Sequence, residues 1–424
     1  MKVRLLEGHS AVRVTTAFNM LLSLAGVNVT AVAFHADRVI VDVRLRRRRL
    51  VCPHCGWSTR WRYDTQPHPS TWRALDLGVW RVTVRATLRR LACRPCRRVV
   101  VEAVEFARHG ARFTRDVEDL VAWLAARMDK TAICRLCRVN WRTVGAIIER
   151  VVADELDPKR LDDLYEVGID EVSYRTQHHY LTIVANHRTG DVVWCDEGKD
   201  TAAAERFYDA LGEARSHQLR AVSMDMGKAY PKVTRQRAPQ ATICWDPYHV
   251  VALATRELDV VRRAQWNHLR ATTDPATAKR FKGARWALLK RPEDLSERQA
   301  DQLAALKRAG GKVWRAYQLK EALRALFAGD LAPVEAAALL DRWCAWAQRC
   351  RIPGFVMLAR TMRDHRDGIL AAIRLGITNA RVEGLNNRVR LITRRGFGFH
   401  SAKAVAALVM LSCGPITLML PHEQ

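Results

Sequence analysis

The fold of the chain's central part is decided by one stretch, Glu166-Val167-Gly168-Ile169-Asp170-Glu171-Val172. Its apolar residues are typical of a buried strand, and Asp170 closes the apolar run. A second such run, Ala221-Val222-Ser223-Met224, is closed by Asp225. Further β-rich runs cover 180–185, 191–195 and 241–246, and a helical pattern covers 201–214. We therefore expect an α/β core in which Asp170 and Asp225 emerge at the ends of neighbouring strands of a mixed sheet.

A third acidic residue, Glu383, completes a candidate catalytic set. It belongs to a polar stripe at helical spacing, which consists of Asn379, Glu383, Asn386 and Arg390. An apolar stripe runs beside it and consists of Val382, Leu385, Val389 and Ile392. Carboxylate oxygens are the ligands that Mg²⁺ or Mn²⁺ prefers, and two such ions can activate a water and stabilise a leaving 3′ oxygen during phosphodiester cleavage. Any one acid at a strand end is more often a solvated cap, so the prediction depends on the combination of three.

Three neighbouring residues compete for the same role. Glu171 should point to the opposite face of its strand from Asp170, because side chains alternate along a strand. Asp246 and His249 close the next β-rich run. We expect these two to support the site or to contact DNA, and Asp246 is the better candidate for a metal ligand.

Two Cys-x-x-Cys pairs, Cys52/Cys55 and Cys93/Cys96, form the strongest local motif. Two such tight turns can close a tetrahedral structural Zn²⁺ site. The stretch between them is longer than the roughly 15–20 residues of a common zinc ribbon, so we expect a strand hairpin to fill it. The alternative is two unrelated pairs of buried cysteines. A third pair, Cys134/Cys137, has no partner pair and is interpreted as core packing.

Three helical stretches, 114–124, 131–136 and 141–151, predict a helix-turn-helix unit, with Thr114 and Asn140 as N-caps. Arg142 and Thr143 begin the last helix, where side chains can reach base edges. Arg135 and Arg138 could hold phosphates, which position a domain without reading sequence. The alternative is an ordinary three-helix packing unit that makes no DNA contact.

The charge of the chain favours a polyanionic partner. The 424 residues carry a formal net charge of +26, and residues 38–98 alone hold 16 basic and 3 acidic side chains. Such a localised field is typical of a nucleic-acid docking surface. Within it, the run Arg46, Arg47, Arg48 and Arg49 is interpreted as a phosphate contact rather than a solvated edge strand. We find no clean apolar run of about 20 residues and no signal peptide, and therefore expect a cytoplasmic protein with no membrane partner.

Residues 250–375 are helical in pattern and contain five tryptophans, Trp266, Trp286, Trp314, Trp343 and Trp346. Tryptophans can stack on unpaired bases at a distorted DNA end. Helix-bundle core is the commoner role of such residues, and we favour that interpretation.

Five motifs in this order resemble the DDE transposases of bacterial insertion sequences, specifically the ISL3 group with its N-terminal zinc-binding domain. The motifs are Gly168-Ile169-Asp170-Glu171, Ser223-Met224-Asp225-Met226, Trp245-Asp246-Pro247-Tyr248-His249, Asn379-Ala380-Arg381-Val382-Glu383 and Arg394-Arg395-Gly396-Phe397-Gly398. The regions around Cys52 and Asn140 resemble the same group. The chain has Tyr248 where the group usually has Phe, which is a conservative difference.

The resemblance implies a ribonuclease-H-like core with a helical insertion between the second Asp and the Glu, and it assigns Asp170, Asp225 and Glu383 as metal ligands. It also implies metal-dependent cleavage at element ends and joining of the freed 3′ hydroxyl to target DNA. The spacing agrees, since 55 residues separate the two Asp and 158 separate Asp225 from Glu383.

The expected fold class is therefore multidomain α+β, with five parts. They are an N-terminal hairpin and zinc-binding β domain (1–108), a helix-turn-helix domain (109–160), the first part of the ribonuclease-H-like core (161–249), the helical insertion (250–375) and the C-terminal part of the core (376–424).

The expected partners are double-stranded DNA, both the inverted repeats of the element and the target, and a second copy of the chain in a dimer or higher assembly. Arg390, Arg394 and Arg395 are further candidate DNA contacts. Two alternatives remain open: a catalytically inactive DNA-binding regulator derived from such an enzyme, and a hydrolytic nuclease or resolvase of the same fold.

Overall fold

In the computed structural model, the alternating residues near the N-terminus form the predicted hairpin, in which β1 and β2 pair antiparallel. The structure describes residues 12–175, 179–329, 331–377, 380–395 and 401–423. The hairpin extends into a four-stranded sheet of order β1-β2-β7-β6, whose buried valines pack with Phe18 of the first helix. The elements are α1 (Val14–Leu22), β1 (Val27–Phe34), β2 (Arg38–Leu45), β6 (Ser70–Arg73) and β7 (Arg81–Ala86).

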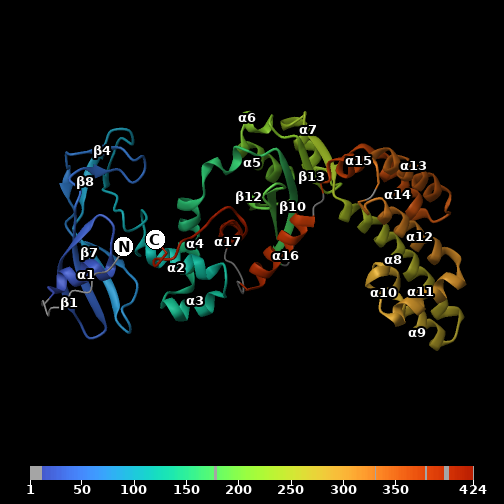
Figure 1. The fold of residues 1–424 in the computed structure, drawn as a ribbon, viewed down its shortest axis with the longest axis horizontal. Coiled ribbons are helices and arrows are strands. Elements are labelled where there is room, and N and C mark those ends of the chain that lie inside the picture. The colour runs from blue at the N-terminus through green and yellow to red at the C-terminus, as the bar shows by residue number, and fades with distance from the viewer. Residues whose placement is uncertain (1–11, 176–178, 330, 378–379, 396–400, 424) are drawn as a thin grey trace. The chain divides into compact units, whose positions relative to one another are not determined.

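Two small sheets carry the cysteine pairs beside this first sheet (Figure 1). In the two-stranded sheet, β3 precedes the first cysteine turn and β4 follows it. In the three-stranded sheet of order β5-β8-β9, the second cysteine turn connects β8 to β9. The strand hairpin expected between the cysteine pairs is present as β6 and β7, which pair antiparallel, and further short strands lie beside it in the sequence. Their bounds are β3 (Leu50–Val51), β4 (Ser58–Thr59), β5 (Asp64–Thr65), β8 (Arg89–Cys93) and β9 (Arg98–Val101).

The three predicted helices follow, as α2 (Arg115–Ala125), α3 (Lys130–Cys137) and α4 (Trp141–Glu155). Asn140 caps α4 as predicted, because its side chain accepts a hydrogen bond from the Thr143 amide at 2.8 Å. Thr114 occupies the N-cap position of α2 but its side chain makes no capping bond there. Val144, Ile148 and other apolar residues of α4 are buried against α2 and α3.

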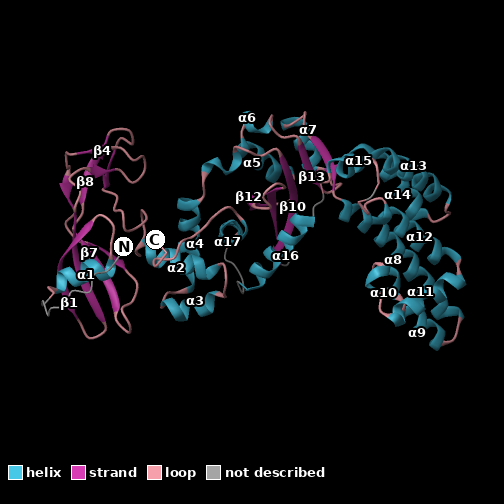
Figure 2. Ribbon diagram, viewed as in Figure 1, coloured by secondary structure: helices cyan, strands magenta, loops and turns pink. Residues whose placement is uncertain are grey.

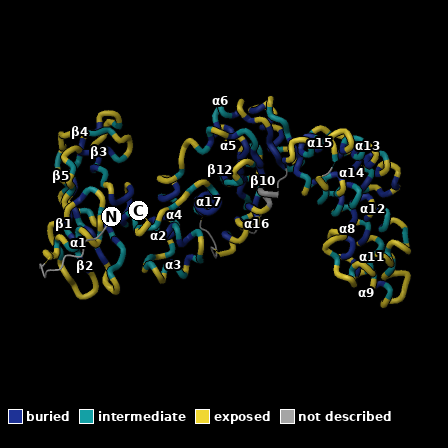
Figure 3. Tube along the Cα trace, in the orientation of Figure 1, coloured by how far each residue is buried: buried dark blue, intermediate teal, exposed yellow. Residues whose placement is uncertain are grey.

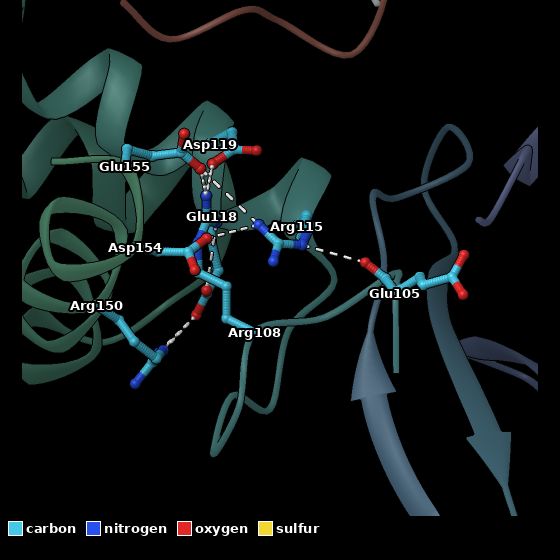
Figure 4. A network of polar contacts seen from close by, with 8 residues as sticks. All are labelled: Glu105, Arg108, Arg115, Glu118, Asp119, Arg150, Asp154 and Glu155. Carbon is cyan, nitrogen blue, oxygen red and sulfur yellow. Dashed lines mark hydrogen bonds and ion pairs between the residues drawn. The ribbon is translucent and has the colours of Figure 1, made fainter. Parts of the chain in front are cut away.

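A buried network of charges joins the loop after β9 to α2 and α4, with Arg108 at its centre (Figure 4). The side chains of Arg108 and Glu118 are 2% and 0% exposed. The guanidinium of Arg108 contacts four carboxylates: Glu118 at 3.6 Å, Asp119 at 2.8 Å, Asp154 at 2.8 Å and Glu155 at 2.6 Å. Arg150 binds Glu118 at 2.5 Å and Arg115 binds Asp154 at 2.6 Å. Buried charges of both signs therefore fix this loop against the helices.

The expected α/β core contains a five-stranded mixed sheet of order β12-β11-β10-β13-β14 (Figure 2). β10, β11 and β12 pair antiparallel, whereas β13 and β14 run parallel to β10. The central strands are buried on both faces, which explains their continuous apolar sequence. The strands are β10 (Glu166–Arg175), β11 (His179–Asn186), β12 (Val192–Glu197), β13 (Ala221–Met224) and β14 (Thr242–Trp245).

Helices pack on this sheet from several parts of the sequence. The pair α5 and α7 pack on each other, and α5 contacts β12 while α7 contacts β13; α15 contacts β14 and α17 contacts β12. α17 is mostly buried and ends at Cys413. These elements are η1 (Pro158–Leu161), α5 (Thr201–Leu211), α6 (Glu213–Ser216), α7 (Ala229–Arg237), α15 (Arg366–Leu375), α16 (Ala380–Arg395) and α17 (Ala402–Cys413).

Between β14 and α15 the chain is helical, as predicted, and its longest helix is α8 (Pro247–Thr272). α8 packs along α12 and α14, and the apolar core of this region is continuous with that of the sheet. The remaining elements are α9 (Pro275–Gly283), α10 (Arg285–Leu289), η2 (Pro292–Asp294), α11 (Glu297–Ala309), α12 (Gly311–Ala325), α13 (Pro333–Arg349) and α14 (Pro353–Asp364).

The five tryptophans of the helical region divide between core and surface. Trp343 is 3% exposed, and its Nε1 donates to a backbone carbonyl of α12 at 2.8 Å. Trp314 is partly buried against the same core. Trp266 is also partly buried. The predicted core role is wrong for Trp286 and Trp346, which are 53% and 37% exposed.

The chain divides into two compact units. One comprises residues 1–156, 395–397 and 416–424, and the other comprises 157–394 and 398–415. Among the described helices, none combines the length and the apolar character needed to cross a membrane.

Candidate active site

The register of the mixed sheet aligns three aspartates across adjacent strands. Gly168 of β10 lies opposite Ser223 of β13, and Met224 of β13 lies opposite Trp245 of β14. Continuing the same register brings Asp170, Asp225 and Asp246 onto one line, because parallel strands end at the same edge. The prediction that Asp170 and Asp225 lie on neighbouring strands is confirmed.

The prediction that Asp170 ends its strand was wrong. β10 continues to Arg175 because its other edge remains paired with β11 as far as His179. Its pairing with β13, however, stops at Gly168. Asp170 therefore lies just beyond the parallel pairing, in the middle of a strand but at the open edge that it shares with Asp225.

Asp170 is buried and is held by two hydrogen bonds. The Glu171 amide donates to Oδ1 at 2.7 Å, and Nδ2 of the buried Asn386 donates to Oδ2. Burial and the charge of Asp225 raise the pKa of Asp170. The sequence placed Asn386 in the polar stripe with Glu383 but assigned it no role, because nothing in the sequence links it to a residue 216 positions away.

Asp225 is held by His249, which lies in the first turn of α8. Nδ1 of His249 lies 2.8 Å from Oδ2 of Asp225, and Nε2 lies 3.6 Å from Oδ2 of Asp246. Burial alone would lower the pKa of His249, but the bond to Asp225 and the charges of Asp225, Asp246 and Asp170 outweigh it and raise the pKa. Oδ1 of Asp225 is buried and has no hydrogen-bond partner within the described part of the chain.

Asp246 contacts this histidine and so supports the site indirectly. It caps α8 by accepting a bond from the Tyr248 amide at 3.2 Å, and burial raises its pKa to about 6. The group whose ligand atoms lie within 4.8 Å of one another consists of Asp170, Asp225 and His249. The sequence favoured Asp246 over His249 as a metal ligand, whereas His249 is the one of the two whose ring nitrogen lies within 4.8 Å of the carboxylates of Asp170 and Asp225.

Glu171 neighbours Asp170 along β10 and lies opposite Thr182 of β11. Burial raises the pKa of Glu171 to about 7, and the charges of Asp225 and Asp170 add to this shift. Glu383 lies within α16, the helix that carries Asn386, but its side chain falls outside the described part of the structure. Arg390, Arg394 and Arg395 follow on the same helix and are exposed.

The residues at this edge fit a divalent cation. Two carboxylates and a histidine converge, and one carboxylate oxygen is buried with no partner among the described residues. An unpaired buried oxygen is costly unless a donor or a cation satisfies it. Carboxylate oxygens suit a hard cation, while His249 already binds one of the acids.

The four predicted zinc ligands, Cys52, Cys55, Cys93 and Cys96, form a second cluster whose ligand atoms lie within 4.8 Å of one another. Sγ of Cys52 lies 3.8 Å from Sγ of Cys96, and Sγ of Cys55 lies 3.4 Å from Sγ of Cys93. Four thiolates about 2.3 Å from a tetrahedral zinc ion are separated by about 3.8 Å. The cluster therefore fits zinc. Cys134 and Cys137 join no such group in the described residues.

The predicted DNA contacts of the helical unit differ in how accessible they are. Arg135 and Arg142 are exposed, and Thr143 is partly exposed. The hydroxyl of Thr143 donates to the side chain of Asn140 at 2.8 Å, so it strengthens the cap. Arg138 is held by an ion pair with Asp76 at 3.2 Å, which competes with any phosphate.

The arginine run also makes internal bonds. Arg46 donates to Asn28 at 2.7 Å, Arg49 donates to Ser58 at 3.2 Å, and Arg47 binds Glu105 and the carbonyl of Ala103. Arg48 is exposed. Part of this run therefore makes internal contacts, although Arg46, Arg48 and Arg49 are all exposed.

Comparison with known proteins adds independent information. Residues 167–409 match the ISL3 DDE family model described as "Transposase", and residues 102–152 match the "Helix-turn-helix domain of transposase family ISL3". The chain is 44% identical over 398 residues to the transposase for insertion sequence element IS1557 of Mycobacterium tuberculosis, in both strain CDC 1551 / Oshkosh and strain H37Rv, covering 88% of each chain. It is 28% identical over 355 residues to the transposase for insertion sequence element IS1001 of Bordetella parapertussis, covering 83% of this chain and 86% of that protein.

Proposed function

Because the chain belongs to the ISL3 family of DDE-type transposases, we propose that Asp170, Asp225 and Glu383 are its metal-binding catalytic carboxylates. The register of β10 and β13, which brings Asp170 and Asp225 together at one open edge, is the observation that carries this proposal. Glu383 is proposed from its position one turn before Asn386 on α16, since Asn386 binds Asp170.

The proposed cation is Mg²⁺ or Mn²⁺. When bound, such an ion would polarise the scissile phosphodiester and lower the pKa of the attacking water. The protein's own part is to hold the ligands: Asn386 fixes one oxygen of Asp170, and His249 fixes one oxygen of Asp225 and leaves the other available. Ligands held by hydrogen bonds lose less freedom when they bind a metal.

The remaining assignments complete the proposal. The five-stranded sheet is a ribonuclease-H-like core, formed by residues 161–249 and 376–424 and interrupted by a helical insertion at 250–375. The cysteine cluster within residues 1–108 holds a structural Zn²⁺. The helix-turn-helix within 109–160 binds the terminal inverted repeats, and the arginine run with Arg390, Arg394 and Arg395 adds phosphate contacts.

The protein is further proposed to act as a homodimer or higher assembly on DNA, because insertion joins two ends of one element to a target. This follows from the chemistry of the reaction.

The test uses three isosteric variants, Asp170→Asn, Asp225→Asn and Glu383→Gln, with the exposed Glu205→Gln of α5 as a matched control. Each of the three should lose DNA cleavage by at least about 10³-fold while binding the inverted repeat with unchanged affinity, because the charges needed for the metal are lost and the DNA-binding units are untouched. The repeat sequence is read from the DNA flanking the gene. Cleavage that persists in all three variants would contradict the assignment.

The same assay separates the alternatives. If the chain is a regulator that has lost catalysis, the wild-type protein binds the repeat without cutting it. A hydrolytic nuclease would cut but would not join the 3′ end to a second duplex. Joined products, measured with a labelled element end and an unlabelled target, support transposition.

A further inference from the structure

The long helix α8 starts at the candidate active site and leads away from it. Asp246 is its N-cap and His249 lies in its first turn. It has 26 residues, which at 1.5 Å per residue is a length of about 39 Å. A group at its far end therefore has a defined distance along the helix from the acids.

Basic residues recur on α8 every seven positions from His249. They are Arg256, Arg263 and Arg270, and all three are exposed. Residues seven apart share one side of a helix, with a drift of about 20° per repeat. The positions that α8 buries lie on the opposite side and are Val250, Ala254, Leu258 and Arg262. Figure 3 colours the residues of α8 and of the helices after it by how far each is buried.

The far end of this stripe continues into a basic and aromatic surface. Residues 262–291 contain nine basic side chains and one acidic one. The guanidinium of Arg270 and the ammonium of Lys282 each lie over the ring of Trp266, 5.3 Å from its centroid. A guanidinium held against a ring still has N–H groups at its edge that can bind a phosphate. Trp286, exposed beside Arg285, extends the surface.

Internal ion pairs do not neutralise this stripe. Asp259 pairs with Arg263 at 3.1 Å and with the buried Arg262, so Arg263 is partly compensated. Arg256 and Arg270 make no ion pair with any residue that the structure describes. Exposed cations that lack an internal counter-charge are available to an anionic partner.

We propose that the α8 stripe of Arg256, Arg263 and Arg270 binds the phosphate backbone of the duplex DNA whose scissile bond occupies the active site. The proposal rests on the proposed function, because it takes the edge with Asp170 and Asp225 as the cleavage site. Seven residues of helix span about 10.5 Å, which corresponds to about three base pairs of 3.4 Å. Arg270 lies about 31 Å from His249 along the axis, so the contact extends about nine base pairs from the cut.

The experiment compares two triple variants of the full-length protein with equal charge loss. One is Arg256→Ala/Arg263→Ala/Arg270→Ala. The other replaces three exposed cations of α11, Arg298, Lys307 and Arg308, by alanine. Binding of a duplex that carries the terminal inverted repeat and at least about 15 base pairs on either side of the cleavage position is measured between 50 and 200 mM salt, without metal, so that no cleavage occurs.

Each lost phosphate contact reduces the slope of log affinity against log salt by about 0.9. The stripe variant should therefore lose about 2 to 3 units of slope, whereas the α11 variant keeps the wild-type slope. Equal slopes in the two variants would overturn the proposal. This binding measurement requires no catalysis. If the protein does not cut DNA, the proposed function is refuted, but the salt dependence still tests whether the stripe binds DNA.

The reaction products test which duplex the stripe binds. Because the stripe is proposed to hold the element end, its variant should lose cleavage of the donor duplex by at least about tenfold, as expected for one or more lost contacts of about 1.4 kcal/mol. Donor cleavage at the wild-type level with a loss of joining alone would show that the stripe binds target DNA instead, and would contradict the proposal. Cleavage and joining both at the level of the α11 variant contradict the proposal.

Discussion

Replacing Arg108 by methionine should destabilise the helix-turn-helix unit by about 3–5 kcal/mol, the usual cost of removing one partner from a buried ion pair. Methionine replaces the aliphatic part of the arginine side chain, so the change removes mainly the guanidinium with its charge. Arg108 is 2% exposed and faces four carboxylates, of which Glu118 is 0% exposed. Glu118 keeps Arg150 as a partner, whereas Asp119 loses its nearest cation.

The loss should depend on pH through Asp119. Burial raises the pKa of Asp119 above its ordinary value of 3.8, and the charge of Arg108 opposes this rise. Without Arg108 the pKa rises further. A carboxyl group with a higher pKa in the folded chain favours folding below its unfolded pKa, and this contribution is lost as the pH rises through the folded pKa. The destabilisation should therefore be largest at neutral pH and smaller as the pH is lowered towards the folded pKa.

The assay is hydrogen exchange of the backbone amides of α2 and α4 in the full-length protein, because it reports the opening of this unit alone. A loss of about 3–5 kcal/mol accelerates exchange by roughly 150- to 5,000-fold, since about 1.4 kcal/mol corresponds to tenfold. Arg115→Met is the control. Its side chain is 38% exposed, so it should cost no more than about 1 kcal/mol. Equal acceleration in the two variants would refute the reasoning.

Three further predictions concern the zinc cluster, the acid site and the helical insertion. Purified protein should contain about one zinc per chain, because four thiolates bind one ion. Cys93→Ser should lower this zinc content by at least about tenfold, whereas Cys134→Ser should leave it unchanged. A Cys93→Ser protein with full zinc would contradict the site. Asn386→Ala should weaken metal binding about 10- to 100-fold by calorimetry, because it removes the donor to a buried carboxylate, whereas the exposed Asn387→Ala should not; equal affinities would show that the amide does not position the ligand. Trp343→Ala should destabilise the insertion by about 3–5 kcal/mol in chemical denaturation, because it opens a cavity and frees a buried carbonyl, and a loss below about 1 kcal/mol would contradict its place in the core.

The sequence by itself determined those features that depend on residues close together in the chain. Two residues between cysteines set the geometry of a metal-binding turn, and the strands between the pairs did not alter that geometry. Helical periodicity with a capping Asn140 was enough to predict three helices, because cap and apolar face are local properties. Apolar runs ending in Asp170 and Asp225 likewise predicted adjacent strands, since a buried parallel sheet requires such runs.

Only the tertiary structure decided which distant groups meet. Asn386 reaches Asp170 across 216 positions, and His249 binds Asp225 because the register of three strands aligns their ends. The sequence predicted that Arg138 contacts a phosphate, and only the fold placed Asp76 beside it as a competing partner. Periodicity gives the side of an element that is buried, but it does not give the partner, because the partner depends on packing between segments far apart in the chain.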